Sequence, residues 1–421
     1  MQADWGIIGH DHLGQMRDRR DLGLAKVIRF ANEYSVPGLA GLSFLRSIVW
    51  ALIGVDFAAA RAVEGRPLSA SVIAEGAEAL ACWHAIDKGL KQDPRIRGVR
   101  KLPLVNAKDL TLKRLARGRG YVSQPIRVGV GAALPALGLV EARNSRFNSF
   151  TLSERGKEFL KFAFNEKTTK DALPLLWAWL DGGTWPNDED RQRQIGKELR
   201  RLSPTVSLPD PARKFFSDLM ESAGKGTDLR TRRSLWMTCN QVLGETPKIK
   251  EDKLVAEVIA RVQETDKETG DRLIWSQQFF NLYAEAFSVL DKIEPLIREA
   301  PKKSAKLADL ARNQSLRVVV STFEKSAKTL QNLPKPVDWP KDLEKFLDDV
   351  VDQSTEKVVR VLVGRDEHVL RLEDDGSAPK VALHPDFNLE RRGALEDESE
   401  FKPKQLDRLR NLCELGREVM Q

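Results

Sequence analysis

Residue types that could do chemistry are sparse in this chain, and the first candidate is a pair of histidines near its start. His10 and His12 flank Asp11 in the stretch GHDHLG, a spacing that could clip a metal ion. No further His or Cys lies nearby in the sequence to complete a ligand set. The other histidines stand apart from one another: His84, His368 and His384. The sequence therefore predicts no bound metal and no other cofactor.

A second candidate is the glycine-rich stretch GRGYVSQPIRVGVG, because glycine-rich loops can cradle phosphate groups. The stretch lacks the lysine of the GxxxxGKS/T motif and does not match GxGxxG. Gly118 and Gly120 are therefore interpreted as residues that shape a turn.

Acidic and aromatic clusters are the remaining candidates. Carboxylates gather at Asp348-Asp349 and at Glu373–Asp375 without a base or nucleophile, so solvated faces or turns are the better interpretation. Three tryptophans could form a stacking platform, but packing in a core or between domains is expected of them: Trp177, Trp179 and Trp185. The sequence shows neither the carboxylate–lysine motif nor the histidine-rich metal motif that a nuclease would need. The sequence favours a non-catalytic protein and leaves open an enzyme whose site follows no known motif.

Positive charge is the chemistry that the sequence does concentrate. The 421 residues carry a net charge of +7, with a pI of about 9.2. Between Lys88 and Arg127 there are twelve Lys or Arg and two Asp, a net charge of +10, and residues 128–161 add +2. The rest of the chain is therefore net negative, and the basic segment favours an anionic partner.

The cysteines and the apolar stretches indicate the compartment. Cys82, Cys239 and Cys413 are far apart in the sequence, so neither a disulfide framework nor a zinc knuckle is expected, and the cytoplasm is the predicted location. The first residues do not resemble a signal peptide. The longest apolar stretch is interrupted by Arg46 and Asp56, so no membrane span or membrane partner is predicted.

The elements that must position these residues are predicted to be mainly α-helical, in a multidomain chain. Residues 42–62 are apolar nearly all round, which is typical of a central core helix. The stretch that begins at Lys357, KVVRVLVGRDEHVLRLEDDGSAPKVALHP, is predicted to form strands, with a closing helix from Pro403. The predicted segments are a helical bundle (1–90), a basic segment with an embedded domain (91–165), a helical domain (166–335) and a small α+β part (336–421).

The embedded domain follows from the order of patterns between residues 105 and 165. NAKDLTLKRLARGR predicts a helix, and SQPIRVGVGAALPAL predicts another, with Ser123 as its cap and Pro125 in its first turn. GLVEA and SFTLS predict two strands around a hairpin tip, RNSRFN, and Ser153 is expected to cap the next helix. Strand parity places Phe147 and Phe150 on opposite faces, so at most one should be buried.

These stretches resemble a winged helix-turn-helix domain of the transcription-regulator type. In that family a Leu-Gly-Leu-Val-Glu turn enters the wing and Leu-Thr-Glu-Arg-Gly leaves it; here Leu137–Glu141 and Leu152–Gly156 correspond. The resemblance implies that the second helix enters the DNA major groove and that the hairpin lies along the backbone or the minor groove. The second helix departs from the pattern, because Gln124–Leu137 offers few side chains that could contact base edges.

The predicted function is therefore a non-catalytic DNA-binding or adaptor subunit of a larger assembly, with protein partner subunits. Contacts to phosphates of double-stranded DNA are sequence-independent. The expected contact residues are Lys113, Arg114, Arg117, Arg119, Arg127, Arg143 and Arg146. In general make-up the chain is similar to subunits of prokaryotic multigene DNA-defence (antiviral) systems. The alternative is a purely protein–protein scaffold whose winged helix docks a partner.

Overall fold

The computed structural model describes residues 21–116, 120–122, 124–300, 304–366, 369–373, 376, 378–381 and 406–421. The chain forms two compact units, each made of separate stretches of sequence. The larger unit comprises Asn32–Leu273 and Asp407–Gln421, and the smaller unit comprises Met1–Ala31 and Ile274–Leu406. The four segments expected from the sequence do not coincide with these units, because the chain leaves each unit and later re-enters it.

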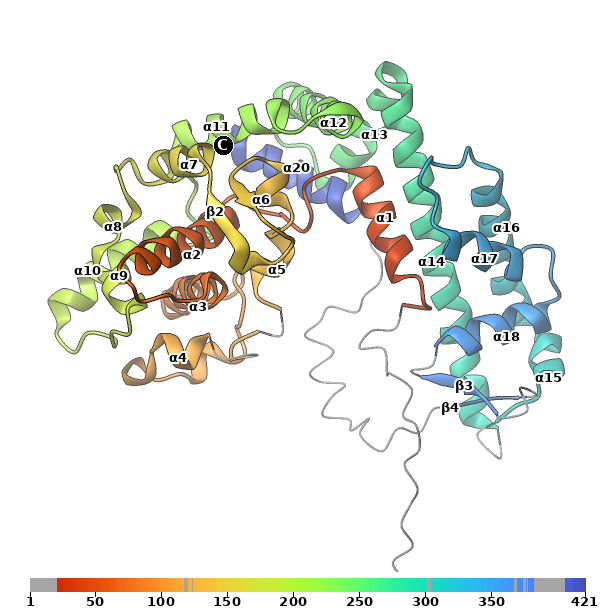
Figure 1. The fold of residues 1–421 in the computed structure, drawn as a ribbon. Coiled ribbons are helices and arrows are strands. Elements are labelled where there is room, and N and C mark those ends of the chain that lie inside the picture. Colours follow the sequence, from red (N-terminus) through yellow and green to blue (C-terminus); the bar gives the residue numbers. More distant parts are fainter. Residues whose placement is uncertain are drawn as a thin grey trace, which may run out of the picture. The chain divides into compact units, whose positions relative to one another are not determined.

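The fold is mainly α-helical, as predicted, and the described strands form two small antiparallel hairpins (Figure 1). The helices that lie wholly in the larger unit are α2 (Arg46–Val63), α3 (Ala70–Asp87), α4 (Leu112–Leu115), α5 (Ile126–Val130), α6 (Ala133–Ala136), α7 (Glu154–Phe164), α8 (Thr169–Ala172), α9 (Pro174–Leu180), α10 (Glu189–Leu202), α11 (Asp210–Ser222), α12 (Gly226–Glu245), α13 (Glu251–Thr265) and α20 (Asp407–Met420). Its 3-10 helices are η1 (Leu102–Leu104), η2 (Ala107–Asp109) and η3 (Phe147–Ser149), and its strands are β1 (Val140–Ala142) and β2 (Phe150–Leu152).

Helix α2 is the centre of the larger unit, which confirms the core helix predicted over residues 42–62. It lies beside α3 and also contacts α5, α7 and β2 (Figure 1). Trp50 is fully buried, and its indole N–H donates to the Leu202 carbonyl of α10 at 3.0 Å. The charge that interrupts the apolar stretch, Arg46, is also buried, and its guanidinium donates to the Val206 carbonyl at 2.9 Å. A buried charge with such partners is tolerated inside a core.

Helix α20 belongs to the larger unit, which corrects its expected place in a C-terminal α+β part. Its apolar face is fully buried and packs with α11, α12 and α13: Leu409, Leu412, Cys413 and Leu415. One of its carboxylates, Glu418, accepts a hydrogen bond of 2.8 Å from the N–H of Leu45, at the start of α2. Apolar packing and this buried bond attach α20 to helices encoded far upstream.

The smaller unit contains α15 (Leu307–Arg312), α16 (Gln314–Asn332), α17 (Lys341–Val350), α18 (Thr355–Asp366), β3 (Leu370–Leu372) and β4 (Pro379–Val381). Two further helices, α1 (Ala25–Ser35) and α14 (Lys267–Glu299), contribute residues to both units. In the smaller unit's core, Phe323 of α16 and Phe346 of α17 meet edge to face, with ring centroids 6.2 Å apart.

The prediction of strands throughout the valine-rich stretch after Lys357 is wrong in its first part. Residues up to Asp366 form helix α18, and the strands begin only at Leu370. Val358, Val359, Leu362 and Val363 are all fully buried, and their spacing puts them on one face of a helix. The packing of this face against α15, α17 and β3 outweighs the strand preference of valine.

Candidate nucleic-acid interface

The hairpin predicted as a wing is present in the larger unit. Strands β1 and β2 pair antiparallel, with Val140 opposite Leu152 and Ala142 opposite Phe150. At the base of the hairpin the Ser153 hydroxyl donates to the Gly138 carbonyl at 2.6 Å and accepts from the Gly156 N–H at 3.1 Å. Ser153 therefore caps α7, as the sequence predicts, and also ties the two ends of the hairpin together.

The far end of the hairpin is a loop closed by its own side chains. The Asn144 side chain accepts a hydrogen bond of 2.8 Å from the Arg146 N–H, and the Ser149 hydroxyl donates to the Arg146 carbonyl at 2.7 Å. Phe147 and Phe150 are both buried, at 9% and 7% exposure, with ring centroids 5.4 Å apart. The prediction that at most one of them is buried is wrong, because the 3-10 turn η3 interrupts the extended backbone on which strand parity depends.

This loop is anchored to the start of α3 by Asn148. The Oδ1 atom of Asn148 accepts from the Ser71 N–H at 2.9 Å and from the Ser69 hydroxyl at 3.1 Å. Ser69, the residue directly before α3, makes no capping hydrogen bond with its side chain. An amide 77 residues away in the sequence satisfies the first turn instead. No local pattern could reveal this partner.

The predicted recognition helix, Gln124–Leu137, is not one continuous helix. It forms α5 and α6, which are separated at Gly131-Ala132. Two features explain the break: Pro135 has no N–H to donate to Gly131, and the Gly129 carbonyl accepts a bond of 2.7 Å from Gly41 outside the helix. The helix predicted before it is also short, with η2 and α4 in its place. Neither α5 nor α6 presents a row of polar side chains suited to base contacts.

Two carboxylates of α3 hold the start of α5. The guanidinium of Arg127 donates from Nε to a carboxylate oxygen of Glu75 at 2.7 Å, and the Arg127 side chain is only 24% exposed. Glu78 is fully buried, and it accepts from the Ile126 N–H at 2.8 Å while Arg97 lies 3.9 Å away. Burial raises the pKa of Glu78 to about 7, and the charge of Arg97 opposes this rise. Arg127 therefore has an internal partner and is not a free phosphate ligand.

The other predicted contact residues are placed differently. Arg143 and Arg146 are exposed at the end of the hairpin, and no carboxylate pairs with either in the described part of the chain. Lys113 and Arg114 are exposed on α4, which packs on α3, and Arg114 pairs with Asp109 at 3.0 Å. Arg117 and Arg119 lie outside the described residues. Among the predicted residues, the hairpin end therefore brings together the two exposed, unpaired arginines.

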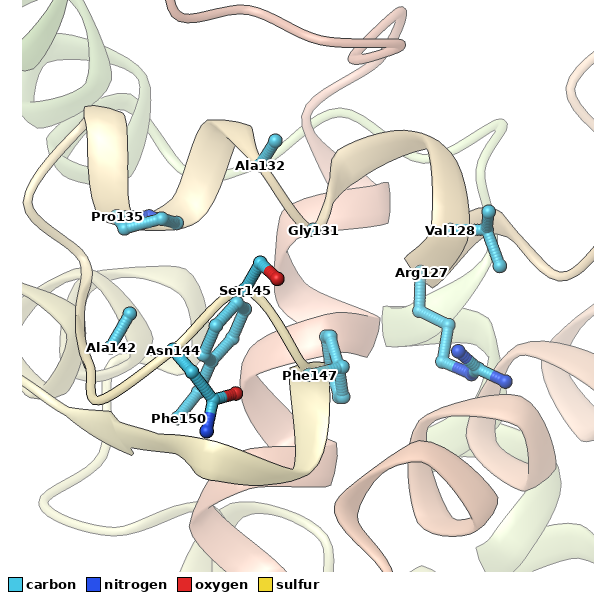
Figure 2. Close-up of a pocket in the computed structure, with 10 residues that line it drawn as sticks. All are labelled: Arg127, Val128, Gly131, Ala132, Pro135, Ala142, Asn144, Ser145, Phe147 and Phe150. Carbon is cyan, nitrogen blue, oxygen red and sulfur yellow. The ribbon is translucent and has the colours of Figure 1, made fainter.

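A pocket of about 510 Å³ lies between this hairpin loop and the helices α5 and α6 (Figure 2). Its polar side chains are Arg127, Asn144 and Ser145. The remaining side chains are apolar: Val128, Ala132, Pro135, Ala142, Phe147 and Phe150. The sequence pattern did not predict this pocket, because it depends on the break between α5 and α6.

The other candidate residues that lie in the described part of the chain have structural roles. The three tryptophans pack as expected: Trp177 against Phe57 (centroids 4.6 Å apart), Trp179 by a bond of 2.9 Å to the Leu110 carbonyl, and Trp185 against Trp83 (5.0 Å). His84 is buried on α3, and this burial lowers its pKa. The predictions for His10, His12, His368, His384 and Gly118 lie outside the described residues.

Within the described residues, no group of three or more His, Cys, Asp or Glu is arranged to hold a metal ion. The helices described here also include none with the length and apolar character needed to span a bilayer. Comparisons with protein-family models, with curated proteins and with solved structures found no match to this chain.

Proposed function

We propose that the larger unit binds double-stranded DNA without sequence preference, with the end of the β1–β2 hairpin against the phosphate backbone. The observation that carries the proposal is the exposed pair Arg143 and Arg146 on a loop that Asn148 fixes to α3. A fixed loop presents its guanidinium groups at low entropic cost, and guanidinium groups match phosphate geometry well. Lys113 and Arg114 on α4 extend the proposed interface.

Sequence independence follows from what the neighbouring helices lack. Arg127, the arginine of α5, is held by Glu75, and α6 carries no charged residue. Base discrimination depends on polar side chains that reach base edges in a groove. The proposed contacts are therefore limited to phosphates, in a subunit that works with protein partners, as in a prokaryotic DNA-defence assembly.

Replacement of both Arg143 and Arg146 by glutamate tests the proposal. The double variant is expected to bind duplexes of unrelated sequence more weakly and to the same degree for each. Its plot of log affinity against log salt should be shallower by roughly 2, because two phosphate contacts are lost. Titration of labelled duplexes at several salt concentrations measures both quantities.

A matched control is Arg191→Glu with Arg193→Glu, since these arginines of α10 are 71% and 69% exposed and the charge change is identical. The control should retain more affinity and a steeper salt dependence than the hairpin variant. Equal losses in the two variants, or the absence of DNA binding at low salt, would overturn the proposal.

A protein scaffold is the second candidate function, and internal ion pairing favours it. Several cations of the basic segment already have carboxylate partners: Arg95 with Asp93, Arg97 with Glu78, Arg114 with Asp109 and Arg127 with Glu75. Such pairing weakens the field available to DNA. Co-purification from the native host separates the two functions, because a scaffold retains its protein partner after nuclease treatment and binds no duplex.

A further inference from the structure

The pocket beside the hairpin has the dimensions and lining of a small-ligand site. Its volume of about 510 Å³ lies within the range of roughly 300–1,000 Å³ typical of such sites. Those sites are mainly apolar with a few polar groups, and here three of the lining residues have polar side chains while the others are apolar (Figure 2). The Phe147 and Phe150 rings are in contact with each other and form part of the wall.

The same loop supplies the lining of the pocket and the exposed arginines. Asn144 and Ser145 line the pocket, and Arg143 and Arg146 are their immediate neighbours in the sequence. A ligand that fits this arrangement has a flat apolar part for the pocket and an anionic part directly next to it. A nucleotide within a strand has this chemistry, because each base is attached to a backbone phosphate.

We propose that the pocket receives an unpaired base of the DNA whose phosphates contact Arg143 and Arg146. This inference rests on the proposed function. Bases of an intact duplex stay stacked inside the helix, so the pocket remains empty there, whereas an unpaired base enters it. The protein therefore binds DNA that carries an unpaired base more tightly than fully paired DNA.

Little discrimination among the four bases accompanies this preference. Arg127 is paired with Glu75, and the side-chain Oδ1 of Asn144 already accepts from the Arg146 N–H. The contacts left to a base are mainly apolar and aromatic surfaces, which accept any base because every base has a π-face.

The test compares a labelled, fully paired duplex with the same duplex carrying one unpaired thymidine. Wild-type protein should bind the second roughly tenfold more tightly, a gain typical of one stacked base. The double variant Ala132→Leu with Ala142→Leu fills the pocket from two exposed positions and leaves every arginine in place. It should bind both DNAs as the wild type binds the paired duplex.

Met237→Leu serves as the control, because Met237 is half exposed on α12 and lies outside the pocket lining. This variant should keep the preference for the unpaired base, and circular dichroism should show that every variant is folded. Replacement of thymidine by each other nucleotide should change the preference only slightly.

Two results overturn the inference while the proposed function stands. They are equal wild-type affinity for the two DNAs, and an unaltered preference in the pocket-filled variant. Failure to bind either DNA overturns the proposed function itself. A further measurement uses an acidic peptide with a single tyrosine. Suppose that the wild type binds this peptide but no DNA, and that the pocket-filled variant does not bind the peptide. The pocket then docks a protein instead.

Discussion

At the scale of single residues, Arg143 and Arg146 differ from Arg127 in their surroundings, because Arg127 is paired with a carboxylate of α3. Arg143 and Arg146 flank Asn144-Ser145, a pair suited to a turn, and they are exposed at the hairpin end. Arg127 has a residue type and position equally suited to phosphate, yet Glu75 holds it from 52 residues away. Local spacing carries no information about such a pair, and the same limit hides the anchor Asn148.

Glu78 should make the stability of the larger unit depend on pH. Its pKa is about 7 in the folded protein and 4.5 ordinarily, because burial disfavours the charged carboxylate. Between these values the folded state holds a proton that the unfolded state has released, so stability falls as pH rises from about 4.5 to about 7. Above that range the folded unit carries the full cost of a buried charge.

Glu78→Gln removes this titration and keeps an oxygen that accepts from the Ile126 N–H. At pH 8 the variant should be more stable than the wild type by roughly 3 kcal/mol, the equivalent of the shift in pKa. At pH 4 the difference should nearly vanish. Urea unfolding across the pH range measures it, and a constant difference at all pH values would contradict the assignment.

Asn148→Ala should destabilise the start of α3 by about 1 kcal/mol, the usual cost of losing a cap. It should also weaken DNA binding, since the loop with Arg143 and Arg146 loses its anchor. Asn148→Asp keeps an acceptor for the Ser71 N–H and adds a charge favoured at a helix start, so it should stay close to the wild type. The rate of hydrogen exchange at the Ser71 amide measures the loss of its hydrogen bond to residue 148 directly. Faster exchange in both variants would exclude capping as the cause.

At the scale of elements, strong local signals were sufficient for the hairpin and for α7. The strand pairs, the cap at Ser153 and the central helix α2 were all predictable, because each depends on neighbours in the sequence. The break between α5 and α6 is less predictable. The sequence shows Gly129, Gly131 and Pro135, but it does not show the hydrogen bond from the Gly41 N–H to the Gly129 carbonyl. The valine-rich sequence of α18 predicts a strand, and the structure differs because these valines pack on α15, α17 and β3, which the sequence does not identify as partners.

Gly156 explains why the motif that leaves the hairpin ends in glycine. A Cβ atom at this position would lie 2.1 Å from the Leu139 carbonyl oxygen, a backbone atom that cannot move aside easily. Gly156→Ala should therefore cost about 1–3 kcal/mol and shift β1 away from α7. Gly244→Ala in α12 is the control, because a Cβ atom there would meet nothing within 4 Å apart from the adjacent residues and the backbone of its own helix. That change should be neutral or stabilising, by up to about 1 kcal/mol. Thermal unfolding compares the two, and equal effects would contradict the steric explanation.

At the scale of the whole molecule, the division into units was the least predictable feature. The sequence offers composition shifts near residues 90, 165 and 335, but a unit is defined by which faces bury one another. Helix α20 has an ordinary amphipathic pattern, and nothing in that pattern indicates that its partner is α12 of the larger unit. The fold class was accessible from periodicity alone, whereas the assembly of segments was not.

Leu412→Ala should destabilise the larger unit alone. The side chain is fully buried, and such truncations cost about 2–5 kcal/mol. Hydrogen exchange should increase at the start of α2 and along α12, and it should be unchanged in α16 and α17. Val337→Ala, at a fully exposed position of the smaller unit, is the control and should change neither. Uniform loosening of both units would show that they do not unfold separately.

The attachment of α20 to the larger unit also sets an order of events during synthesis. A ribosome makes Leu45 and the helices around the hairpin first, then the stretch of the smaller unit, and only afterwards the carboxylate of Glu418 that accepts the Leu45 N–H. Domains often fold while the chain is still emerging. Before α20 is made, the face of α12 that α20 covers is exposed, and the Leu45 N–H at the start of α2 lacks its acceptor Glu418. By then the described segments of the smaller unit have all been translated. The packing of the larger unit is thus completed last, although most of its residues are translated early.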